Sequence, residues 1–293
     1  MCFGHQFCLS PDSEDNFSPN LSTQGKSIYG RISDYQTIAK PYGNCQEILT
    51  NWSSAVVHAQ IIKVTQGCEY TVHGAVGRET IVVVEEGMGE VRFLGKQLAL
   101  SPLCAIKLGP TGTISFYAKT QLHLFQASMC VSESPSDQQD NIEFCNADSQ
   151  EWKLYEYEAL GQEIFTPRHP GSIGLLRFMF PQDAIPVHLH PFSGRIIRPI
   201  SGEGYTYMHP DRCPMNRDTF AAFDANVVHT NGPLKNNTYE LWAFQLPWIE
   251  SKIDTQNIGG HENFVRYVSN VPTPDRWKTK QQLLDIADSR RNA

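Results

Sequence analysis

Three histidines in the sequence have the spacing of a metal site. His188 and His190 lie two residues apart in the segment PVHLHPFSGRIIRPISGEG, and side chains at this spacing point to the same face of a β-strand. His229 follows about forty residues later in a second strand-like segment, DTFAAFDANVVHTNG. Two imidazoles from one strand and a third from a distant strand can hold one ion on one side and leave other positions open for a substrate. The spacing therefore predicts a mononuclear metal centre inside a β-barrel.

The elements that must position these histidines are predicted to be β-strands. From residue 55 to about 129, and again from 161 to 250, short runs rich in Val, Ile and Phe are broken by Gly, Pro or Lys, which is typical of an antiparallel sandwich or barrel. We therefore predict an N-terminal arm (1–54), a first β domain (55–130), a linker (131–160), a second β domain (161–250) and a tail (251–293). The arm is expected to wrap the first domain and could include short strands of its own, and the polar segment 132–146 is expected to form the linker.

The tail is predicted to contain a helix over residues 273–292. Thr273 has the side chain of an N-cap, and Pro274 and Asp275 suit the first turn. Apolar residues further on would form the buried face of this helix: Trp277, Leu283, Leu284 and Ile286. We expect the arm and this helix to cover strand edges that would otherwise be exposed.

The two strand-rich halves repeat each other. The segment EYTVHGAVGRETIVVVEEGMG aligns with IPVHLHPFSGRIIRPISGEG when Gly87 and Gly89 are set on Gly202 and Gly204. In this alignment His73 and Ala75 are the counterparts of His188 and His190, and a second aligned pair of segments, KQLALSPLCAIKLG and DTFAAFDANVVHTNG, sets Lys107 against His229. A single imidazole beside a lysine has little affinity for a divalent ion, so the first copy is predicted to be metal-free and structural.

The second half resembles the cupin superfamily, and the whole chain resembles a bicupin. His188, His190 and Gly202 match the first cupin motif, and the segment from Asp224 to His229 matches the second motif loosely. Asn226 stands where that motif has glycine, which is compatible because asparagine tolerates the left-handed backbone conformation; Asn231 is the counterpart of the motif's asparagine. The resemblance implies an all-β fold of two jelly-roll barrels, with the arm and the tail outside them.

The sequence departs from the cupin motif at the usual metal-binding glutamate, where it has Arg195. A guanidinium group cannot ligate a cation. What remains is a three-histidine site, similar to those of thiol dioxygenases and diketone-cleaving dioxygenases in the superfamily, and the resemblance then implies Fe(II), with Zn, Ni, Mn or Cu as other ions that fit these ligands. Arg195 could clamp a substrate carboxylate; alternatively it pairs with Glu203 or Glu240, or lies outside the barrel.

Four further residues are candidates for the lining of the cavity: Tyr205, Tyr207, Trp242 and Gln245. The alternative for the aromatic residues is a place in the core, which is commoner in small barrels. Strand alternation counted from Arg195 places Arg198 on the outer face, and Arg177 is a weaker candidate for an inward position. The sequence identifies no catalytic acid, base or nucleophile.

Three classes of function are compatible with this pattern. The first is a mononuclear non-haem iron dioxygenase that acts, with O2, on a small anionic or chelating metabolite. The second is an isomerase, epimerase or lyase in which Zn, Ni or Mn polarises a carbonyl group. The third is a non-catalytic bicupin that binds a small molecule. Retention of all three histidines in one copy favours an enzyme over the third class.

The net charge, the cysteine spacing and the visible targeting signals limit the expected classes of partner and the expected cellular compartment. The net charge is −7 and the chain has no long basic run, which argues against nucleic acid or an anionic membrane as a partner. The eight cysteines form no CxxC pair, and neither a signal peptide nor an apolar span of membrane length is visible. We therefore expect a cytoplasmic protein with reduced thiols, and a homodimer, as is frequent among cupins.

Overall fold

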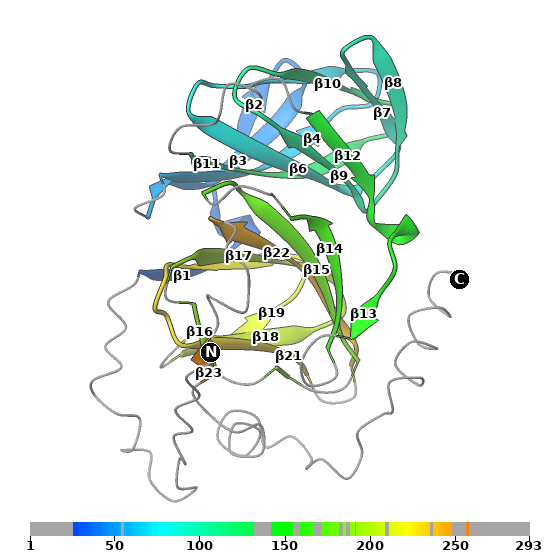
Figure 1. Ribbon diagram of the computed structural model, residues 1–293. Coiled ribbons are helices and arrows are strands. Elements are labelled where there is room, and N and C mark those ends of the chain that lie inside the picture. Colours follow the sequence, from blue (N-terminus) through cyan, green and yellow to red (C-terminus); the bar gives the residue numbers. More distant parts are fainter. Residues whose placement is uncertain are drawn as a thin grey trace, which may run out of the picture.

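The structure is a computed structural model, and it describes residues 26–53, 56–131, 142–154, 159–166, 171–181, 184–185, 188–190, 192–208, 211–234, 237–247 and 256–257. These residues form antiparallel strands and two short 3-10 turns. The strands build two barrels, one above the other in Figure 1, and each barrel has a seven-stranded sheet facing a smaller one. The all-β prediction is confirmed, whereas the helix predicted over 273–292 lies outside the described residues. Within the described residues, no helix is long and apolar enough to cross a membrane.

The first barrel encloses an apolar core between its two sheets. Its seven-stranded sheet has the order β12 (Ile142–Asn146), β9 (Cys104–Leu108), β6 (Arg78–Glu86), β11 (Leu122–Cys130), β4 (Val57–Val64), β3 (Gly43–Trp52) and β2 (Ile38–Lys40). The facing sheet has the order β5 (Glu69–His73), β10 (Thr113–Ala118), β7 (Gly89–Phe93) and β8 (Lys96–Leu100). Residues from both sheets, among them Val84, Ile106 and Phe116, meet inside.

The second barrel repeats this arrangement. Its seven-stranded sheet has the order β1 (Ser27–Arg31), β20 (Thr219–Phe223), β17 (Gly194–Ser201), β22 (Tyr239–Leu246), β15 (Gly174–Phe180), β14 (Leu160–Phe165) and β13 (Lys153–Leu154). The facing sheet has the order β19 (Asp211–Met215), β18 (Gly204–Met208), β21 (His229–Pro233), β16 (His188–Leu189) and β23 (Gln256–Asn257). Strands β2 to β11 of the first barrel match strands β13 to β22 of the second in chain order, whereas the edge strand β1 precedes its series and its counterpart β12 follows the other.

One strand of the arm lies on the second barrel. β1 pairs with β20 over the register Ser27↔Phe223 to Arg31↔Thr219, whereas β2 and β3 pair within the first barrel. The expectation that the arm covers the first domain is therefore wrong for β1. The predicted linker contains a strand, β12, which pairs with β9 at the edge of its sheet. This is the position that β1 has beside β20 in the second barrel. Each barrel thus has an edge strand from a segment outside its central strands, which covers backbone groups at that edge.

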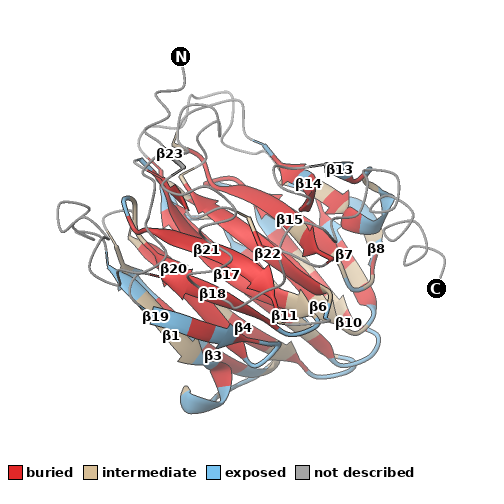
Figure 2. Cartoon of the chain, turned by 90° about the horizontal axis from the view of Figure 1, so that it is seen from below, coloured by how far each residue is buried: buried red, intermediate tan, exposed pale blue. Residues whose placement is uncertain are grey.

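The two seven-stranded sheets pack face to face. Their contact is an apolar cluster with members from both barrels, including Phe125 and Phe244, whose ring centroids are 5.1 Å apart. Because each sheet is buried on both faces, continuous apolar runs replace the usual alternation: Ile81 and Val83 face the other barrel, and Val82 lies inside its own. Figure 2 shows β17 and β22 buried along most of their length.

Buried ion pairs complete this interface. Arg198 on β17 binds Glu85 of the first barrel through two hydrogen bonds of 2.5 and 2.9 Å, which confirms the prediction that Arg198 faces outward. Lys107 of the first barrel lies 3.2 Å from Glu79, and Glu79 also accepts a 2.6 Å hydrogen bond from Ser172, just before β15. Because these charges are largely shielded from water, removing either partner of a pair would leave a costly unpaired charge at the interface.

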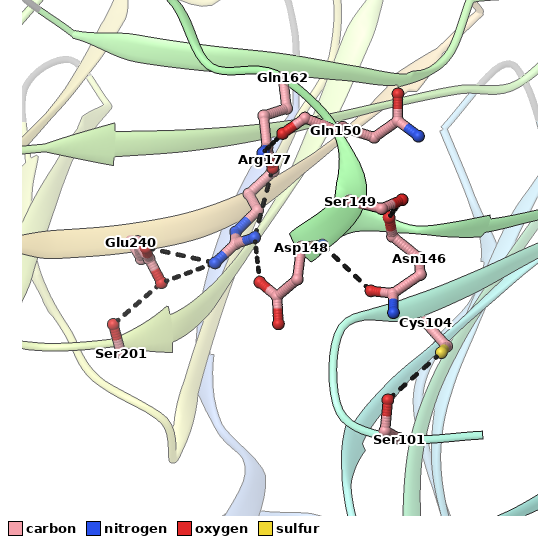
Figure 3. Close-up of polar contacts among 10 residues, drawn as sticks. All are labelled: Ser101, Cys104, Asn146, Asp148, Ser149, Gln150, Gln162, Arg177, Ser201 and Glu240. Atoms are coloured by element: carbon pink, nitrogen blue, oxygen red, sulfur yellow. Dashed lines mark hydrogen bonds and ion pairs between the residues drawn. The ribbon is translucent and has the colours of Figure 1, made fainter. Parts of the chain in front are cut away.

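A polar cluster holds the connecting segment against the second barrel. Arg177 on β15 contacts Asp148 at 3.1 Å and Glu240 at 3.4 Å, and its guanidinium stacks over Trp152 with 4.9 Å to the ring centroid. Figure 3 shows Arg177 between these carboxylates, beside Gln162. Arg177 therefore lies on the outer face of its sheet, and the interpretation that it points into the barrel is wrong.

Candidate metal centre

The three predicted histidines come together inside the second barrel. His188 on β16 and His229 on β21 are direct cross-strand partners, and their ring centroids are 4.2 Å apart. The ring of His190 lies 4.9 Å from that of His188 and 5.0 Å from that of His229. One ligand atom of each histidine lies within 4.8 Å of the others, and all three residues are buried. This cluster has the donors and the spacing to hold one metal ion.

The surroundings of His229 favour a neutral imidazole that can act as a metal ligand. Its Nδ1 lies 2.8 Å from the backbone carbonyl oxygen of Val227, so the Nδ1–H donates to this carbonyl and Nε2 keeps its lone pair for a metal. Burial, followed by the neighbouring His188 and Arg195, holds the pKa of His229 well below its ordinary value, while the Val227 hydrogen bond opposes this shift. A neutral imidazole binds a cation without first losing a proton.

A turn before β21 fixes the position of His190. Asn226 has a φ of +65°, in the left-handed region that asparagine tolerates better than most residues, so the prediction made for this position is confirmed. The backbone N–H of Asn226 donates a 2.8 Å hydrogen bond to the carbonyl of His190. The segment that leads to His229 is thereby tied to the segment that carries the other two histidines.

The wall facing the histidines carries an aromatic ring and a guanidinium. The ring of Phe223 on β20 lies 4.0 Å from that of His229, and Arg195 on β17 is the cross-strand partner of Phe223. Arg195 shares the face of Ile197, a member of the core inside this barrel, whereas Ile196 faces the first barrel. Arg195 therefore points into the barrel, and its charge contributes to the low pKa of His229.

The two faces of the sheet separate Arg195 from one of its predicted partners. Its Nη1 donates to the hydroxyl of Ser193 and, at 2.8 Å, to the carbonyl of Gly194. Glu240, one suggested partner, precedes inward-facing Leu241 by one residue and contacts Arg177 on the outer face. The interpretation of an Arg195–Glu240 pair is therefore wrong.

Two predicted cavity residues on β22 lie on opposite faces. Gln245 is the cross-strand partner of Arg195 and shares its inner face, and its Oε1 is buried without a hydrogen-bond partner among the described residues. Trp242 lies in the apolar cluster between the barrels. It does not line the cavity, and the core alternative is the correct one for this tryptophan.

The two tyrosines on β18 also face away from the histidines. Met208 is the cross-strand partner of His229 and belongs to the core inside the barrel. Tyr205 and Tyr207 alternate with Thr206 and Met208, so their side chains lie on the other face of the sheet, where Arg212 stacks on Tyr205. Their assignment to substrate binding does not fit this geometry.

Sequence reasoning missed polar residues that share the inner face. Thr206 donates a 2.7 Å hydrogen bond to the side chain of Asn231 inside the barrel, and both residues are buried. Ser193, which holds Arg195, is also buried. Counting by two along the strand from Arg195 would have found Ser193, because alternate residues share a face.

The first barrel has apolar side chains at the matching inner positions. Gly89 on β7 and Gly204 on β18 occupy matching places. With these glycines superposed, the pairing of β7 with β10 makes Ile114 the counterpart of His229. Val72 is then the counterpart of His188, because Ile114 pairs with Val72 as His229 pairs with His188. The predicted counterparts are wrong: His73 is exposed on the outer face, and Lys107 binds Glu79 at the barrel interface. Within the described part of the chain, the group able to hold a metal is the histidine trio of the second barrel.

Known structures share this architecture. The crystal structure of protein Ylba from E. coli superposes with a TM-score of 0.63 at 13% identity and covers 79% of this chain and 98% of its own. A mutant of Bacillus subtilis oxalate decarboxylase gives a TM-score of 0.59 at 9% identity, with 78% and 79% covered. A cupin 2 conserved barrel domain protein from Leptotrichia buccalis gives 0.54 at 14% identity, with 75% and 96% covered. No protein-family model and no curated protein sequence matches the chain. The chain has the bicupin fold.

Proposed function

We propose that this bicupin is a metal-dependent enzyme, a mononuclear non-haem iron dioxygenase that acts on a small anionic or chelating metabolite. The observation that carries the proposal is the buried trio of His188, His190 and His229, which offers nitrogen donors alone. Because three neutral imidazoles leave the full charge of a divalent ion uncompensated, its open positions favour an anionic ligand. Fe(II) suits such a site, since it lets a chelating substrate and O2 share the open positions.

The chain's own residues contribute binding and exclusion of water. Val227 orients His229 through its carbonyl group, and the Asn226 turn holds the backbone of His190. Phe223 packs an apolar ring against His229. Arg195 presents a positive charge on the same inner face. Together these features support the binding of an anion in a buried site, where electrostatic interactions are stronger than in water.

A second candidate function is lyase or isomerase chemistry with Zn, Ni or Mn. The observation that favours it is the similarity in fold to Bacillus subtilis oxalate decarboxylase. The same three histidines would serve, and the bound ion would act as a Lewis acid on a carboxylate or carbonyl group. No general acid or base is assigned for this chemistry.

Metal analysis of protein purified without air, followed by oxygen-uptake measurements, separates these functions. The panel of test compounds is cysteine, acetylacetone, glycolate and oxalate. The dioxygenase proposal predicts about one iron per chain and oxygen uptake that depends on one class of these compounds and is absent in His190→Ala. Another bound metal with turnover but no oxygen uptake supports the second candidate. Protein that takes up no divalent metal would contradict both.

A further inference from the structure

The first barrel has polar side chains on part of the inner face of its larger sheet. The neighbouring strands β4, β11 and β6 point Ile62, Leu124 and Val82 into the core of this barrel. Alternate residues of a strand share a face, so the next inward positions towards one end of the barrel follow from these three. They form a polar patch of six residues: His58, Gln60, Arg78, Thr80, Gln126 and Ser128.

The polar patch is continuous across the three strands. Ser128 on the middle strand pairs with His58 on one side and with Thr80 on the other, and Gln126 pairs with Gln60. Side chains at such cross-strand positions start about 5 Å apart. The polar groups therefore lie side by side, within reach of one small molecule.

Water reaches this patch although it lies on the inner face. His58, Gln60, Arg78 and Gln126 are all partly exposed. The Thr80 hydroxyl makes no hydrogen bond within the described part of the chain, yet it is not one of the fully enclosed polar atoms there. The patch is thus solvated at this end of the barrel, and a ligand could replace that water.

The facing sheet contributes a hydroxyl group to the same place. Tyr70 on β5 donates a 2.8 Å hydrogen bond to Oε1 of Gln126, and Nε2 of Gln60 donates to the Tyr70 oxygen at 3.4 Å. Both amide side chains are thereby oriented by a buried residue of the opposite wall. Fixed polar groups bind a ligand at a lower entropic cost than mobile ones.

Arg78 supplies the positive charge of the patch. Its guanidinium donates to the carbonyl of Val56 at 3.3 Å, to the hydroxyl of Ser128 at 3.1 Å and to the sulfur of Cys130 at 3.4 Å. Within the described residues, no carboxylate forms an ion pair with Arg78. The guanidinium is therefore held in position by uncharged groups, and arginine binds carboxylates through charge-assisted and often bidentate hydrogen bonds.

The other members of the patch can both donate and accept hydrogen bonds. Burial, followed by Arg78, lowers the pKa of His58, while Glu47 opposes this shift. A neutral imidazole has one donor nitrogen and one acceptor nitrogen, and the hydroxyl and amide groups of the patch are likewise donors and acceptors. Hydroxyl groups of a ligand suit such surroundings.

We propose that the polar patch of the first barrel is a second ligand site, which binds a small hydroxy-carboxylate without a metal ion. Arg78, at the start of β6, binds the carboxylate, and Thr80, Gln126 and His58 bind the hydroxyl groups. The patch ends at apolar Val82, so the ligand has few carbon atoms. This site goes beyond the proposed function, because it lies in the other barrel and uses none of the three metal-site histidines.

Ligand-observed NMR titrations of the full chain test this site. The metal is first removed by chelation and dialysis, so that no ion in the second barrel can bind the probes. Glycerate carries a carboxylate and hydroxyl groups, propionate lacks the hydroxyl groups, and glycerol lacks the carboxylate. Comparing the three compounds separates the contribution of the charge from that of the hydroxyl groups.

Two variants address the patch, and each has a matched control in the same barrel. Arg78→Gln removes the charge, and its control is Arg92→Gln, at a largely exposed position on β7. Thr80→Val removes only a hydroxyl and keeps the shape, and its control is Thr71→Val, at a residue that contacts Ser115 on the outer face of β5.

The parent protein should bind glycerate more tightly than propionate, and glycerol most weakly. The loss of charge-assisted hydrogen bonds predicts about tenfold weaker binding of glycerate by Arg78→Gln. For Thr80→Val we expect about threefold weaker binding of glycerate and an unchanged affinity for propionate. Both controls should bind like the parent protein.

Glycerate binding that is unchanged in Arg78→Gln, or glycerol binding as tight as that of glycerate, would overturn the proposal. So would a parent protein that does not bind glycerate at millimolar concentration. Thermal unfolding shows whether each variant is folded. If Arg78→Gln does not fold, Thr80→Val decides, and an equal effect on glycerate and propionate, or none on either, overturns the proposal. Because the titrations use metal-free protein, their failure leaves the metal-dependent function standing, and loss of that function leaves this site standing.

Discussion

The two barrels share a scaffold and differ in what fills it. In the first, the inner positions on β5 and β10 carry Val72 and Ile114, whereas the second has His188 and His229 at the matching points. The strand order around these positions is the same. The barrel architecture therefore does not depend on the polar site, and a few inward positions decide whether one copy can hold an ion.

A shared turn shows which features belong to the scaffold. Gly87 in the first barrel and Gly202 in the second have φ values of +89° and +74°. A Cβ atom at either position would lie about 2 Å from a backbone carbonyl oxygen, that of Gln121 or Thr238. Only glycine fits there, whatever the barrel contains. The Gly202 match to the cupin motif thus reports the fold rather than the chemistry.

We expect the largest effect from a variant that removes one histidine ligand from the second barrel. His190→Ala should abolish stoichiometric metal uptake, because two buried imidazoles hold a divalent ion far more weakly than three. Metal analysis after gel filtration measures this, and circular dichroism checks the fold. His73→Ala, on the exposed face of the first barrel, is the control. Equal metal loss in both variants would mean that the barrels do not differ as described.

Among changes outside the metal site, we expect those that break the interface between the barrels to lower the free energy of unfolding most. Glu79→Ala leaves Lys107 buried without its carboxylate, which costs roughly 3–5 kcal/mol. Lys153→Ala breaks a surface pair with Glu163, worth at most about 1 kcal/mol. Urea unfolding of both variants gives the comparison. Similar values for the two would show that the interface pair is not buried in solution.

A reciprocal exchange sharpens the comparison between the interiors. Ile114→His places an imidazole in an apolar core and should lower the free energy of unfolding by about 1–3 kcal/mol. His229→Ile, measured without metal, should cost less or stabilise, because it removes a buried polar group. Urea unfolding of metal-free protein tests both. A larger loss for His229→Ile than for Ile114→His would contradict the view that the trio is kept for binding an ion.

The smallest expected effect concerns the turn before His229. Asn226→Ala at a φ of +65° should cost about 1 kcal/mol, because alanine disfavours the left-handed conformation. Asn226→Gly should be neutral within a few tenths of a kcal/mol. Thermal unfolding distinguishes them. If glycine proved as harmful as alanine, the side chain rather than the backbone conformation of Asn226 would be what matters.

Period-two reasoning along single strands predicted much of the site. The histidine trio, the outward Arg198 and the left-handed Asn226 all follow from residue type and spacing, whereas the sequence leaves open whether Arg195 faces the cavity. Each depends on local geometry that any strand or turn shares.

The sequence did not predict the tertiary contacts between distant segments and between the two barrels. Both faces of the seven-stranded sheets are apolar, so the sequence does not reveal that Trp242 packs between the barrels rather than inside one. The β1–β20 pairing joins segments about 190 residues apart and has no local signal. The repeat alignment shifted the histidine counterparts to His73 and Lys107, because apolar strands of similar length align in more than one register.

X-ray absorption spectroscopy of the metal-loaded protein tests the central claim most directly. An ion held by His188, His190 and His229 predicts a first shell of nitrogen and oxygen atoms, with multiple scattering from three imidazoles. That pattern should fall to two imidazoles or vanish in His229→Ala and persist in His73→Ala. Sulfur in the first shell, fewer than three imidazoles in the parent protein, or an unchanged spectrum in His229→Ala would contradict the account.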